Sequence, residues 1–483
     1  MRMQLQHFIK RYAGNNMNSD DFRRYIENGK RCHLVGIGGV SMSPLAEILN
    51  ATGMTVTGSD VNENTAIKDL RELGIKITIG HAAENVAEAQ FIIRTAAARE
   101  DNIEIKTARD AGIPVFERAQ AWGHIMRDYK NAVCIAGMHG KTTTTSMVSH
   151  ILLAAEADPT IMIGGTLPVL ESGCRVGKGD IIVLESCEYY NSFHNFYPTV
   201  AVILNVDTDH LDFFKDLDDI KNSFKKFASL TPDHGHIICN GDDLNTMQAL
   251  SGLNRELVTF GFNEKSANLD APIRIRGVNV SFSGRSPKMD VEFDGNIVCN
   301  ITLQIPGMHN LKNALAATAA CLMAGISPKA IEEGLYGYTG VGRRFEYKGS
   351  YNGIDVYDDY AHHPYELQAL LDSIYNLDVY NRIILAFQPH TFSRTKALFP
   401  DFVRELKRPD VVILAEIYAA RETNEIGISS GDLAKAVPGA ECISNFNDIT
   451  EKIKNTAKPG DIILTVGAGD IFKVGEELVK SSS

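Results

Sequence analysis

The segment GMHGKT, residues 137–142, decides how the middle of this chain folds. The apolar run at residues 132–136 predicts a buried strand before it, and residues 141–155 predict a helix after it. Gly137 and Gly140 allow a tight turn between the two, in which backbone N–H groups and the positive end of the helix face one point. A turn of this kind is typical of a site that binds phosphate groups.

The two residues after the second glycine add the chemistry for a triphosphate. Lys141 is placed to neutralise β- and γ-phosphate charge, and the Thr142 hydroxyl is placed to bind magnesium. The spacing is shorter than in the GxxxxGK[ST] motif, because position 135 is isoleucine rather than glycine. The segment therefore predicts a site for ATP or GTP, and the plain alternative is a helix N-terminus with an exposed lysine.

Polar residues end the two apolar runs that we expect to flank this strand. Residues 181–184 lead directly to Glu185. Residues 200–204 lead to Asn205, which is followed by Asp207, Asp209 and His210. Ligands bind at the carboxyl ends of strands in doubly wound parallel sheets, so these side chains should meet the phosphate turn. Because Mg²⁺ takes a few protein oxygens together with phosphate oxygens and waters, Thr142 and Glu185 are candidate ligands. His210 is a less usual ligand, and a structural imidazole is an equal alternative.

A second glycine loop, GIGG at residues 36–39, lies near the N-terminus. It follows an apolar run at residues 32–37 and precedes a predicted helix at residues 43–51. Ser59 and Asp60 follow about 20 residues later, where a dinucleotide-binding fold places its ribose contact. The loop is compatible with binding of NAD, with binding of a UDP-sugar or with a purely structural turn. Hydride transfer is the less favoured function, because it needs no triphosphate and a triphosphate site is predicted downstream.

Three further clusters occur at predicted strand ends in the last third of the chain. They are DDYAHHP at residues 358–364, FQPHTFSR at residues 387–394 and GAGD at residues 467–470. Paired histidines beside aspartates could bind zinc, although a catalytic cleft explains them equally well. Arg394 has the forked geometry that suits a carboxylate.

Composition favours an ordinary globular protein of the cell interior. The chain of 483 residues suggests about three domains. Its net charge of −12 argues against a general binder of nucleic acid or membrane surfaces. The eight cysteines form no CxxC pair, and neither a signal peptide nor an apolar run of about 18 residues is evident. We therefore expect a cytoplasmic protein with free thiols, without nucleic-acid or membrane partners.

Strand and helix patterns alternate along the chain, as is typical of parallel sheets. The pattern begins after a predicted helix at residues 20–28, and polar or glycine-rich segments at residues 128–131 and 340–344 interrupt it. A period-two stretch at residues 268–305 predicts an antiparallel insertion or edge. We predict an α/β fold with three domains, at residues 1–129, 130–342 and 343–483.

Taken together, the motifs resemble those of the Mur ligases of bacterial cell-wall synthesis. The resemblance rests on their joint order: HLVGIGG, GMHGKTTTT, NVDTDHLD, GMHNLKNALAA, GVGRRFE, DDYAHHP, FQPHTFSRT and TVGAGD. It implies a Rossmann-like UDP-binding domain, a central P-loop ATPase domain with a parallel sheet, and a Rossmann-like domain that admits the amino acid. The FQPH stretch is similar to that of the alanine-adding member. The implied reaction is ATP- and Mg²⁺-dependent ligation of L-alanine to UDP-N-acetylmuramate through an acyl phosphate, by a monomer or weak dimer.

The resemblance also implies roles for single residues. Catalysis is expected of Lys141, Glu185, His210 and Arg344, and metal binding of Thr142, Glu185 and His210. ATP contacts are expected from Gly137, Met138, His139, Gly140, Lys141, Thr142, Thr143, His309, Asn310, Asn313 and Arg343. The UDP-substrate is expected at Gly36, Gly38, Gly39, Ser59, Asp60 and His81. The amino acid is expected at His362, His390 and Arg394.

The chain departs from the family pattern at several positions. Cys187 and Tyr190 replace acids of the family's EADESDGSF stretch, Met138 replaces a threonine, and Thr391 replaces an arginine. His210, as a metal ligand, would be a poor base for the amine, and the sequence names no other base. Three rival hypotheses stay open: a ligase that recycles muramyl peptides, an NAD-dependent oxidoreductase, and a non-catalytic sensor of UDP-sugar or ATP.

Overall fold

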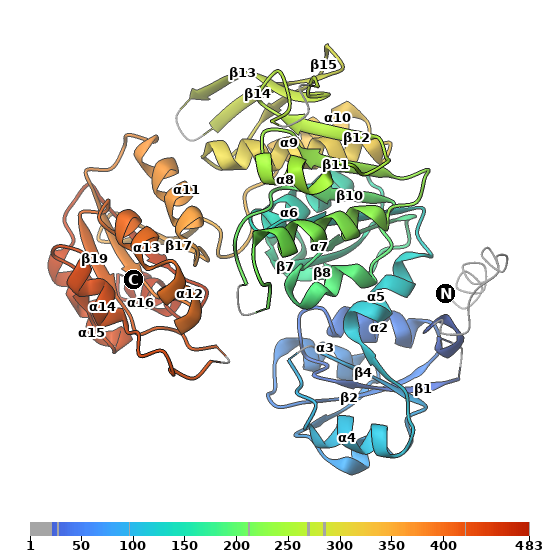
Figure 1. The fold of residues 1–483 in the computed structure, drawn as a ribbon. Helices are drawn as coiled ribbons and strands as arrows, with labels where there is room; N and C mark the ends of the chain where they lie inside the picture. The colour runs from blue at the N-terminus through green and yellow to red at the C-terminus, as the bar shows by residue number, and fades with distance from the viewer. Residues whose placement is uncertain are drawn as a thin grey trace.

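The computed structural model describes residues 22–482, apart from residues 27–28, 96, 211–212, 268–270, 284–285 and 421. Three α/β units follow one another along the chain, coloured from blue to red in Figure 1. Of the predicted helix at residues 20–28, the structure forms the 3-10 helix η1 (Phe22–Tyr25), and residues 20–21 and 27–28 lie outside the described residues. Within the described residues no helix has the length and apolar character needed to cross a membrane.

The N-terminal unit is a parallel sheet in the order β3-β2-β1-β4-β5. The glycine loop follows β1, and the next helix begins where the sequence predicts it. The strands are β1 (Arg31–Val35), β2 (Thr55–Asp60), β3 (Lys76–Ile79), β4 (Phe91–Arg94) and β5 (Val115–Glu117). The helices are α2 (Ser43–Ala51), α3 (Thr65–Glu72), α4 (Ile103–Asp110) and α5 (Arg118–Met126), with the 3-10 turn η2 (Ala83–Val86).

The central unit contains one long sheet in the order β15-β14-β13-β12-β11-β10-β6-β9-β7-β8. Its strands are β6 (Asn131–Ala136), β7 (Thr160–Leu167), β8 (Ser172–Arg175), β9 (Ile181–Glu185), β10 (Val200–Ile203), β11 (His236–Asn240), β12 (Leu257–Gly261), β13 (Ile275–Ser283), β14 (Ser286–Phe293) and β15 (Asn296–Thr302). The last three pair antiparallel, which confirms the predicted antiparallel edge.

Helices cover the central sheet on both faces, so β6, β9 and β10 are buried and consist almost entirely of apolar residues. The helix after the phosphate loop is α6 (Lys141–Ala154), close to its predicted bounds. The other elements are α7 (Leu217–Ser229), α8 (Leu244–Leu250), α9 (Met308–Met323), α10 (Pro328–Tyr336), η3 (Pro168–Leu170) and η4 (Tyr189–Asn195).

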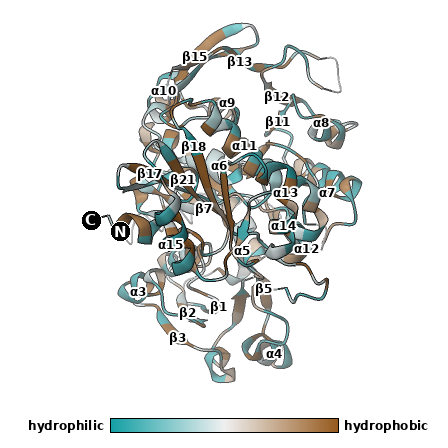
Figure 2. Ribbon diagram, turned by 90° about the vertical axis from the view of Figure 1, so that its left-hand side faces the viewer, coloured by the Kyte–Doolittle hydropathy of each residue, from teal (hydrophilic) through white to brown (hydrophobic). Residues whose placement is uncertain are grey.

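The C-terminal unit has a sheet in the order β16-β17-β21-β18-β19-β20, in which only the β16–β17 pair is antiparallel. The strands are β16 (Glu346–Tyr351), β17 (Ile354–Asp359), β18 (Arg382–Phe387), β19 (Val411–Leu414), β20 (Glu441–Cys442) and β21 (Asp461–Val466). The helices are α11 (Pro364–Tyr375), α12 (Phe392–Ala397), α13 (Phe399–Leu406), α14 (Ser430–Ala436), α15 (Phe446–Thr456) and α16 (Phe472–Lys480). Figure 2 shows β18 and β21 as brown, apolar strands inside this unit.

The apolar cores join the three units unequally. One cluster runs without a break from the N-terminal sheet through Trp122 to Phe193 and the central sheet. The C-terminal clusters, as far as the described residues show, contain no residue of the other two units. The first two units are therefore held together by a shared core, and the third meets them through other contacts. These findings confirm the α/β fold class with three successive units, while the exact boundaries at 129/130 and 342/343 stay predictions.

Candidate active site

The phosphate loop, defined here as residues 137–142, joins β6 to α6 in the predicted turn. Gly137 and Gly140 have φ values of +150° and +83°, which only glycine adopts without strain. Asn205, at the end of β10, ties the loop down: its Oδ1 accepts from the N–H of His139 and its Nδ2 donates to the carbonyl of His139, both at 2.9 Å. These two hydrogen bonds fix the backbone of the loop at His139.

Lys141 lies folded against its own loop beside a buried carboxylate. Its Nζ donates to Glu188 Oε2 at 2.9 Å and to the Met138 carbonyl at 3.1 Å. Burial opposes the charge of Lys141, but Glu188 raises its pKa above the ordinary value. Burial likewise opposes ionisation of Glu188, yet Lys141 and His210 lower its pKa, and His210 Nε2 lies 3.2 Å from Glu188 Oε1. The Glu188 carboxylate thus lies between two groups that can carry positive charge, the Lys141 ammonium and the His210 imidazole.

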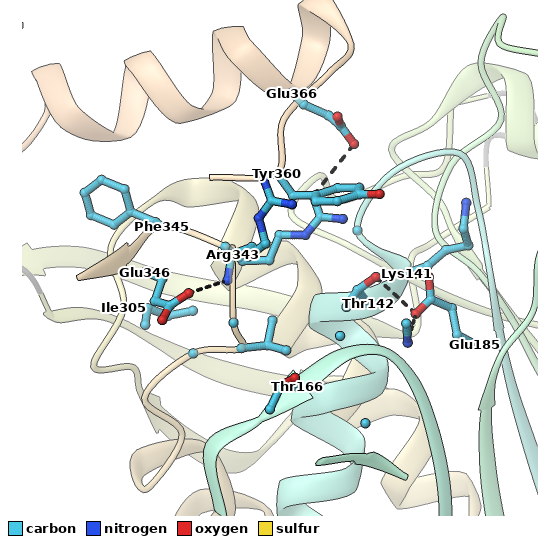
Figure 3. Close-up of a pocket in the computed structure, with 18 of the residues that line it drawn as sticks. Lys141, Thr142, Thr166, Glu185, Ile305, Arg343, Phe345, Glu346, Tyr360 and Glu366 are labelled. Atoms are coloured by element: carbon cyan, nitrogen blue, oxygen red, sulfur yellow. Dashed lines mark hydrogen bonds and ion pairs between the residues drawn. The ribbon is translucent and has the colours of Figure 1, made fainter. Parts of the chain in front are cut away.

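Thr142, the last residue of the phosphate loop, lies beside Glu185, as Figure 3 shows. Thr142 Oγ1 is 3.0 Å from both carboxylate oxygens of Glu185, which also accepts from the N–H of Gly164 at 2.8 Å. A hydroxyl and a carboxylate suit Mg²⁺, which needs few protein oxygens when phosphate and water supply the rest. Over the described residues, no three side chains of His, Cys, Asp or Glu form a group that could hold a metal ion by themselves.

A cavity of about 1170 Å³ opens between the central and C-terminal units. Its central wall carries Lys141, Thr142 and Glu185, and its C-terminal wall carries Arg344 and His362. Figure 3 looks into this space, with Tyr360 and Glu366 facing the phosphate-loop side chains. A smaller neighbouring cavity of about 200 Å³ is lined by His139, Thr143, His309, Asn310 and Asn313. Apart from Gly137, the residues predicted to contact ATP line one or both of these two adjoining cavities.

The two arginines predicted to reach phosphate differ in their contacts. Arg343 Nε donates to Asp358 Oδ2 at 3.0 Å and Arg343 Nη2 donates to the Gly467 carbonyl at 2.6 Å, so its guanidinium is bound within the C-terminal unit. Arg344 lies over the Tyr360 ring at 5.0 Å and 4.0 Å from Glu366 Oε1. Arg344 lines both cavities and is therefore the better placed of the two.

A histidine–glutamate network crosses from the phosphate loop to α11. Glu366 Oε1 lies 3.3 Å from His139 Nδ1, and Glu366 Oε2 accepts from the backbone N–H of His362 at 3.0 Å. His362 Nδ1 lies 3.1 Å from the Tyr360 carbonyl and 3.4 Å from Glu366 Oε2. Burial opposes ionisation of Glu366, but His362, His139 and Arg344 hold its pKa well below the usual value. Burial and the charge of Arg394 lower the pKa of His362 to about 3.

His390 and Arg394 lie beside His362, as the sequence predicts for an amino-acid pocket. The rings of His362 and His390 are 5.5 Å apart, and Arg394 Nη1 donates to His390 Nδ1 at 3.1 Å. Arg394 also binds the Asp209 carboxylate of the central unit, with Nη2 to Oδ1 at 3.0 Å. Burial and Arg394 lower the pKa of His390 to about 4. The guanidinium that is predicted to bind the amino-acid carboxylate is thus paired with Asp209 in this arrangement.

The N-terminal residues predicted to bind a UDP-substrate fall into two groups. Asp60 Oδ2 accepts from the N–H of Gly38 at 2.9 Å, so this carboxylate holds the glycine loop. Ser59 and His81 both contact the buried Glu104, with Ser59 Oγ at 2.6 Å and His81 Nδ1 at 2.8 Å from Oε2. Burial opposes ionisation of Glu104, but hydrogen bonds from its neighbours lower its pKa to about 2. Val40, directly after the glycine loop, lines the large cavity.

The departures from the family pattern have local explanations. Burial raises the pKa of the Cys187 thiol to about 11, so this side chain stays neutral in the cavity wall. Met138 is buried, and Tyr190 packs on Phe213 with ring centroids 4.8 Å apart. Thr391 caps α12 by accepting from the N–H of Arg394.

Four carboxylates of this site were not among the residues predicted to act: Glu104, Glu188, Asp209 and Glu366. Glu188 and Asp209 lie in motifs that the sequence does single out. Glu366 carries a weaker signal, since it stands four residues after His362, just beyond the DDYAHHP motif. Glu104 carries none, because only folding brings it to Ser59.

The fold and site define a three-domain enzyme that uses a nucleoside triphosphate at a P-loop. Family models cover most of the chain: "Mur ligase family, catalytic domain" matches residues 31–130, "Mur ligase middle domain" residues 135–321, and "Mur ligase, glutamate ligase domain" residues 343–469. This protein belongs to the Mur ligase family.

Its relatives match over nearly their whole length. UDP-N-acetylmuramate–L-alanine ligase of Caldanaerobacter subterraneus subsp. tengcongensis is 44% identical, over 95% of this chain and 99% of that protein. The enzyme of the same name from Clostridium acetobutylicum is 45% identical, over 92% and 97%. The crystal structure of UDP-N-acetylmuramate-alanine ligase MurC from Thermotoga maritima has a TM-score of 0.76 at 29% identity, covering 93% of this chain and 98% of that chain.

Proposed function

We propose that this protein is an ATP-dependent ligase that joins L-alanine to the lactyl carboxylate of UDP-N-acetylmuramate in peptidoglycan precursor synthesis. The products are the amide, ADP and phosphate, and the intermediate is an acyl phosphate. One observation carries the proposal: the phosphate-loop residue Lys141 and the amino-acid-pocket residue His362 line the same cavity. The names of the near full-length relatives support the same reaction. A cytoplasmic location and a monomer or weak dimer remain predictions.

Phosphoryl transfer to the lactyl carboxylate requires mainly positioning and charge neutralisation. Lys141 would exchange Glu188 for the β- and γ-phosphates, and Arg344 would face the transferred group from the opposite wall. The nucleotide base would lie in the smaller cavity, next to His309 and Asn313. Thr142 and Glu185 would hold Mg²⁺, which supplies positive charge to the phosphates when bound.

The other two substrates would bind the N-terminal and C-terminal units. The uridine diphosphate would bind the N-terminal glycine loop, at Gly36, Gly38 and Gly39, with Ser59, Asp60 and His81 beside it. The carboxylate of L-alanine would bind Arg394, displacing Asp209 from the guanidinium. Enclosure between the units would exclude water, which would otherwise hydrolyse the acyl phosphate.

The test is phosphate release from ATP in the presence of UDP-N-acetylmuramate and one acceptor at a time. L-Alanine, glycine, L-serine and an L-alanyl-γ-D-glutamyl tripeptide are compared, and the amide is identified by mass. We expect strong release with L-alanine and a product that contains it. Release only with the tripeptide would instead identify a recycling ligase. Bound nucleotide without release for any acceptor would identify a sensor.

The Lys141→Ala variant tests the phosphate loop within this function. We expect ligation to fall by about 10³-fold or more, because the lysine neutralises charge in the transition state. UDP-N-acetylmuramate should still bind, since its predicted site lies on another unit, and calorimetry of that binding is the control. Ligation within tenfold of the unaltered enzyme would contradict the assignment of Lys141.

A further inference from the structure

The proton positions on the pocket histidines distinguish their chemical roles. His362 Nδ1 lies 3.1 Å from the Tyr360 carbonyl oxygen, which can only accept a hydrogen bond. Nδ1 therefore carries the proton, and the lone pair of the neutral ring is on Nε2. Nε2 of His362 makes no hydrogen bond with any residue that the structure describes, and the ring lines the large cavity. The Nε2 atom of His362 is therefore a free hydrogen-bond acceptor in a ring that lines the large cavity.

The neighbouring imidazoles have the opposite arrangement. Arg394 can only donate, so the Nδ1 of His390 that it contacts at 3.1 Å must hold the lone pair. The Nε2 of His390 is then a donor. His363 Nδ1 accepts from the N–H of Tyr365 at 3.3 Å, so its lone pair is also occupied. Of these three rings, only His362 can take up a proton without losing an existing contact.

From this we propose, on the basis of the proposed function, that His362 is the base that removes the proton from the α-ammonium of L-alanine, and that Glu366 is its positioning residue. The ammonium gives one proton to Nε2, and the nitrogen lone pair attacks the carbonyl carbon of the acyl phosphate. The C–O bond to phosphate then breaks, and phosphate leaves with the electron pair. The second proton goes to phosphate and the proton on Nε2 to solvent, which balances the step.

Glu366 serves this role through its two oxygens. Oε2 lies 3.4 Å from His362 Nδ1, where its charge stabilises the imidazolium that forms on proton uptake. Oε1 lies 3.3 Å from Nδ1 of His139 in the phosphate loop, so the same carboxylate joins the base to the nucleotide site. The charged or titratable groups that face the His362 ring are Glu366 of α11, Arg394 of α12, and Tyr360, His390 and Asp209 of adjoining loops. Burial and Arg394 lower the pKa of His362 to about 3, and the negative charge that bound phosphates bring raises this pKa and favours proton uptake.

The experiment compares two acceptors on the whole enzyme. L-Alanine is mostly an ammonium ion at pH 7.5 and needs a base, whereas hydroxylamine is mostly neutral and reacts with acyl phosphates without one. For His362→Asn we expect the alanine rate to fall by about 10²-fold or more, the usual contribution of a general base. The hydroxamate rate with ATP and UDP-N-acetylmuramate should stay within about threefold, because no base acts in that step.

Glu366→Gln should behave in the same way, with a smaller loss of about tenfold for alanine, because it acts through the imidazole. For both variants the alanine rate should rise by about tenfold per pH unit from pH 7 to 9, as the free amine becomes available. Asp432→Asn is the matched control: Asp432 fills the same capping-box position in α14 of the same unit, away from the cavity. It should leave both rates unchanged.

The outcomes separate this inference from the proposed function. If the unaltered enzyme forms no alanine amide, the proposed function fails and the base has no reaction to serve. If it does, and alanine and hydroxylamine rates fall in parallel in His362→Asn, the residue is structural and the inference is overturned. An unchanged alanine rate overturns it as well. Should Glu366→Gln not fold, the two rates of His362→Asn are enough to decide whether His362 is the base.

Discussion

At the scale of single residues, the buried carboxylate of Glu104 has a shifted pKa. This shift predicts a pH-dependent contribution of Glu104 to the stability of the fold. Its folded pKa is about 2, against an ordinary value of 4.5, so folding favours its charged form. The resulting stability is complete above about pH 4.5 and is lost as the pH falls toward 2. One pKa unit is about 1.4 kcal/mol, so Glu104→Gln should destabilise the protein by about 3 kcal/mol at pH 7.

Urea unfolding at several pH values measures this effect. The difference between Glu104→Gln and the unaltered protein should shrink steadily below pH 4.5. Glu63→Gln is the matched control, because Glu63 of the same unit pairs with Arg71 at the surface, where about 40% of each side chain is exposed. That variant should change the free energy of unfolding by less than about 1 kcal/mol. Equal effects of the two substitutions would show that the Glu104 network contributes no special stability.

At the scale of elements, the phosphate loop is closely packed against α9. A Cβ at Gly140 would lie 2.6 Å from Asn313 Oδ1 of α9, and the φ of +83° is itself strained for other residues. Gly140→Ala should therefore displace the loop and weaken ATP binding by about tenfold or more, in addition to about 1–2 kcal/mol of backbone strain. Calorimetric titration with ATP measures the first effect and urea unfolding the second.

The Gly74→Ala variant is the control that separates backbone strain from displacement of the phosphate loop. Gly74 has a φ of +84°, nearly that of Gly140, but a Cβ there meets nothing within 4 Å. The two variants should lose similar stability from backbone strain, and only Gly140→Ala should lose ATP affinity. An ATP affinity in Gly140→Ala equal to that in Gly74→Ala would show that contact with α9 does not shape the loop.

How much of the fold and site the sequence could predict depends on whether the contacts are local or distant along the chain. The strands, helices and glycine turns follow from short apolar runs and local backbone freedom, so β6, α6 and the antiparallel edge could be predicted. The Glu366–His139 contact joins residues 227 positions apart, and the Arg394–Asp209 pair joins residues 185 apart. No local pattern encodes such pairs. The contacts that fix the histidine proton positions join residues only two to four positions apart, but they form only once the loops have folded. The site roles carried by family resemblance stay predictions.

At the scale of the whole molecule, the C-terminal unit is attached differently from the other two. The N-terminal and central units share an apolar core, whereas Arg394–Asp209 and His139–Glu366 bridge the central and C-terminal units. Arg394 and Asp209 are each about 10% exposed, so water screens this pair only weakly. Ion pairs of this kind can exchange partners as the substrates enter, and we expect the C-terminal unit to move about the region near residue 340.

Asp209→Asn tests whether this pair holds the units closed. Burial opposes ionisation of Asp209, but Arg394 keeps its pKa well below the ordinary value, so the carboxylate is charged at pH 7. Its loss leaves a buried guanidinium without its counter-charge, which favours separation of the two units. We expect a larger radius of gyration by small-angle X-ray scattering without ligands. Asp372→Asn, which breaks the Arg408 pair inside the C-terminal unit, should leave that radius unchanged. Equal radii for the two variants would mean that the Arg394–Asp209 contact follows closure and does not cause it.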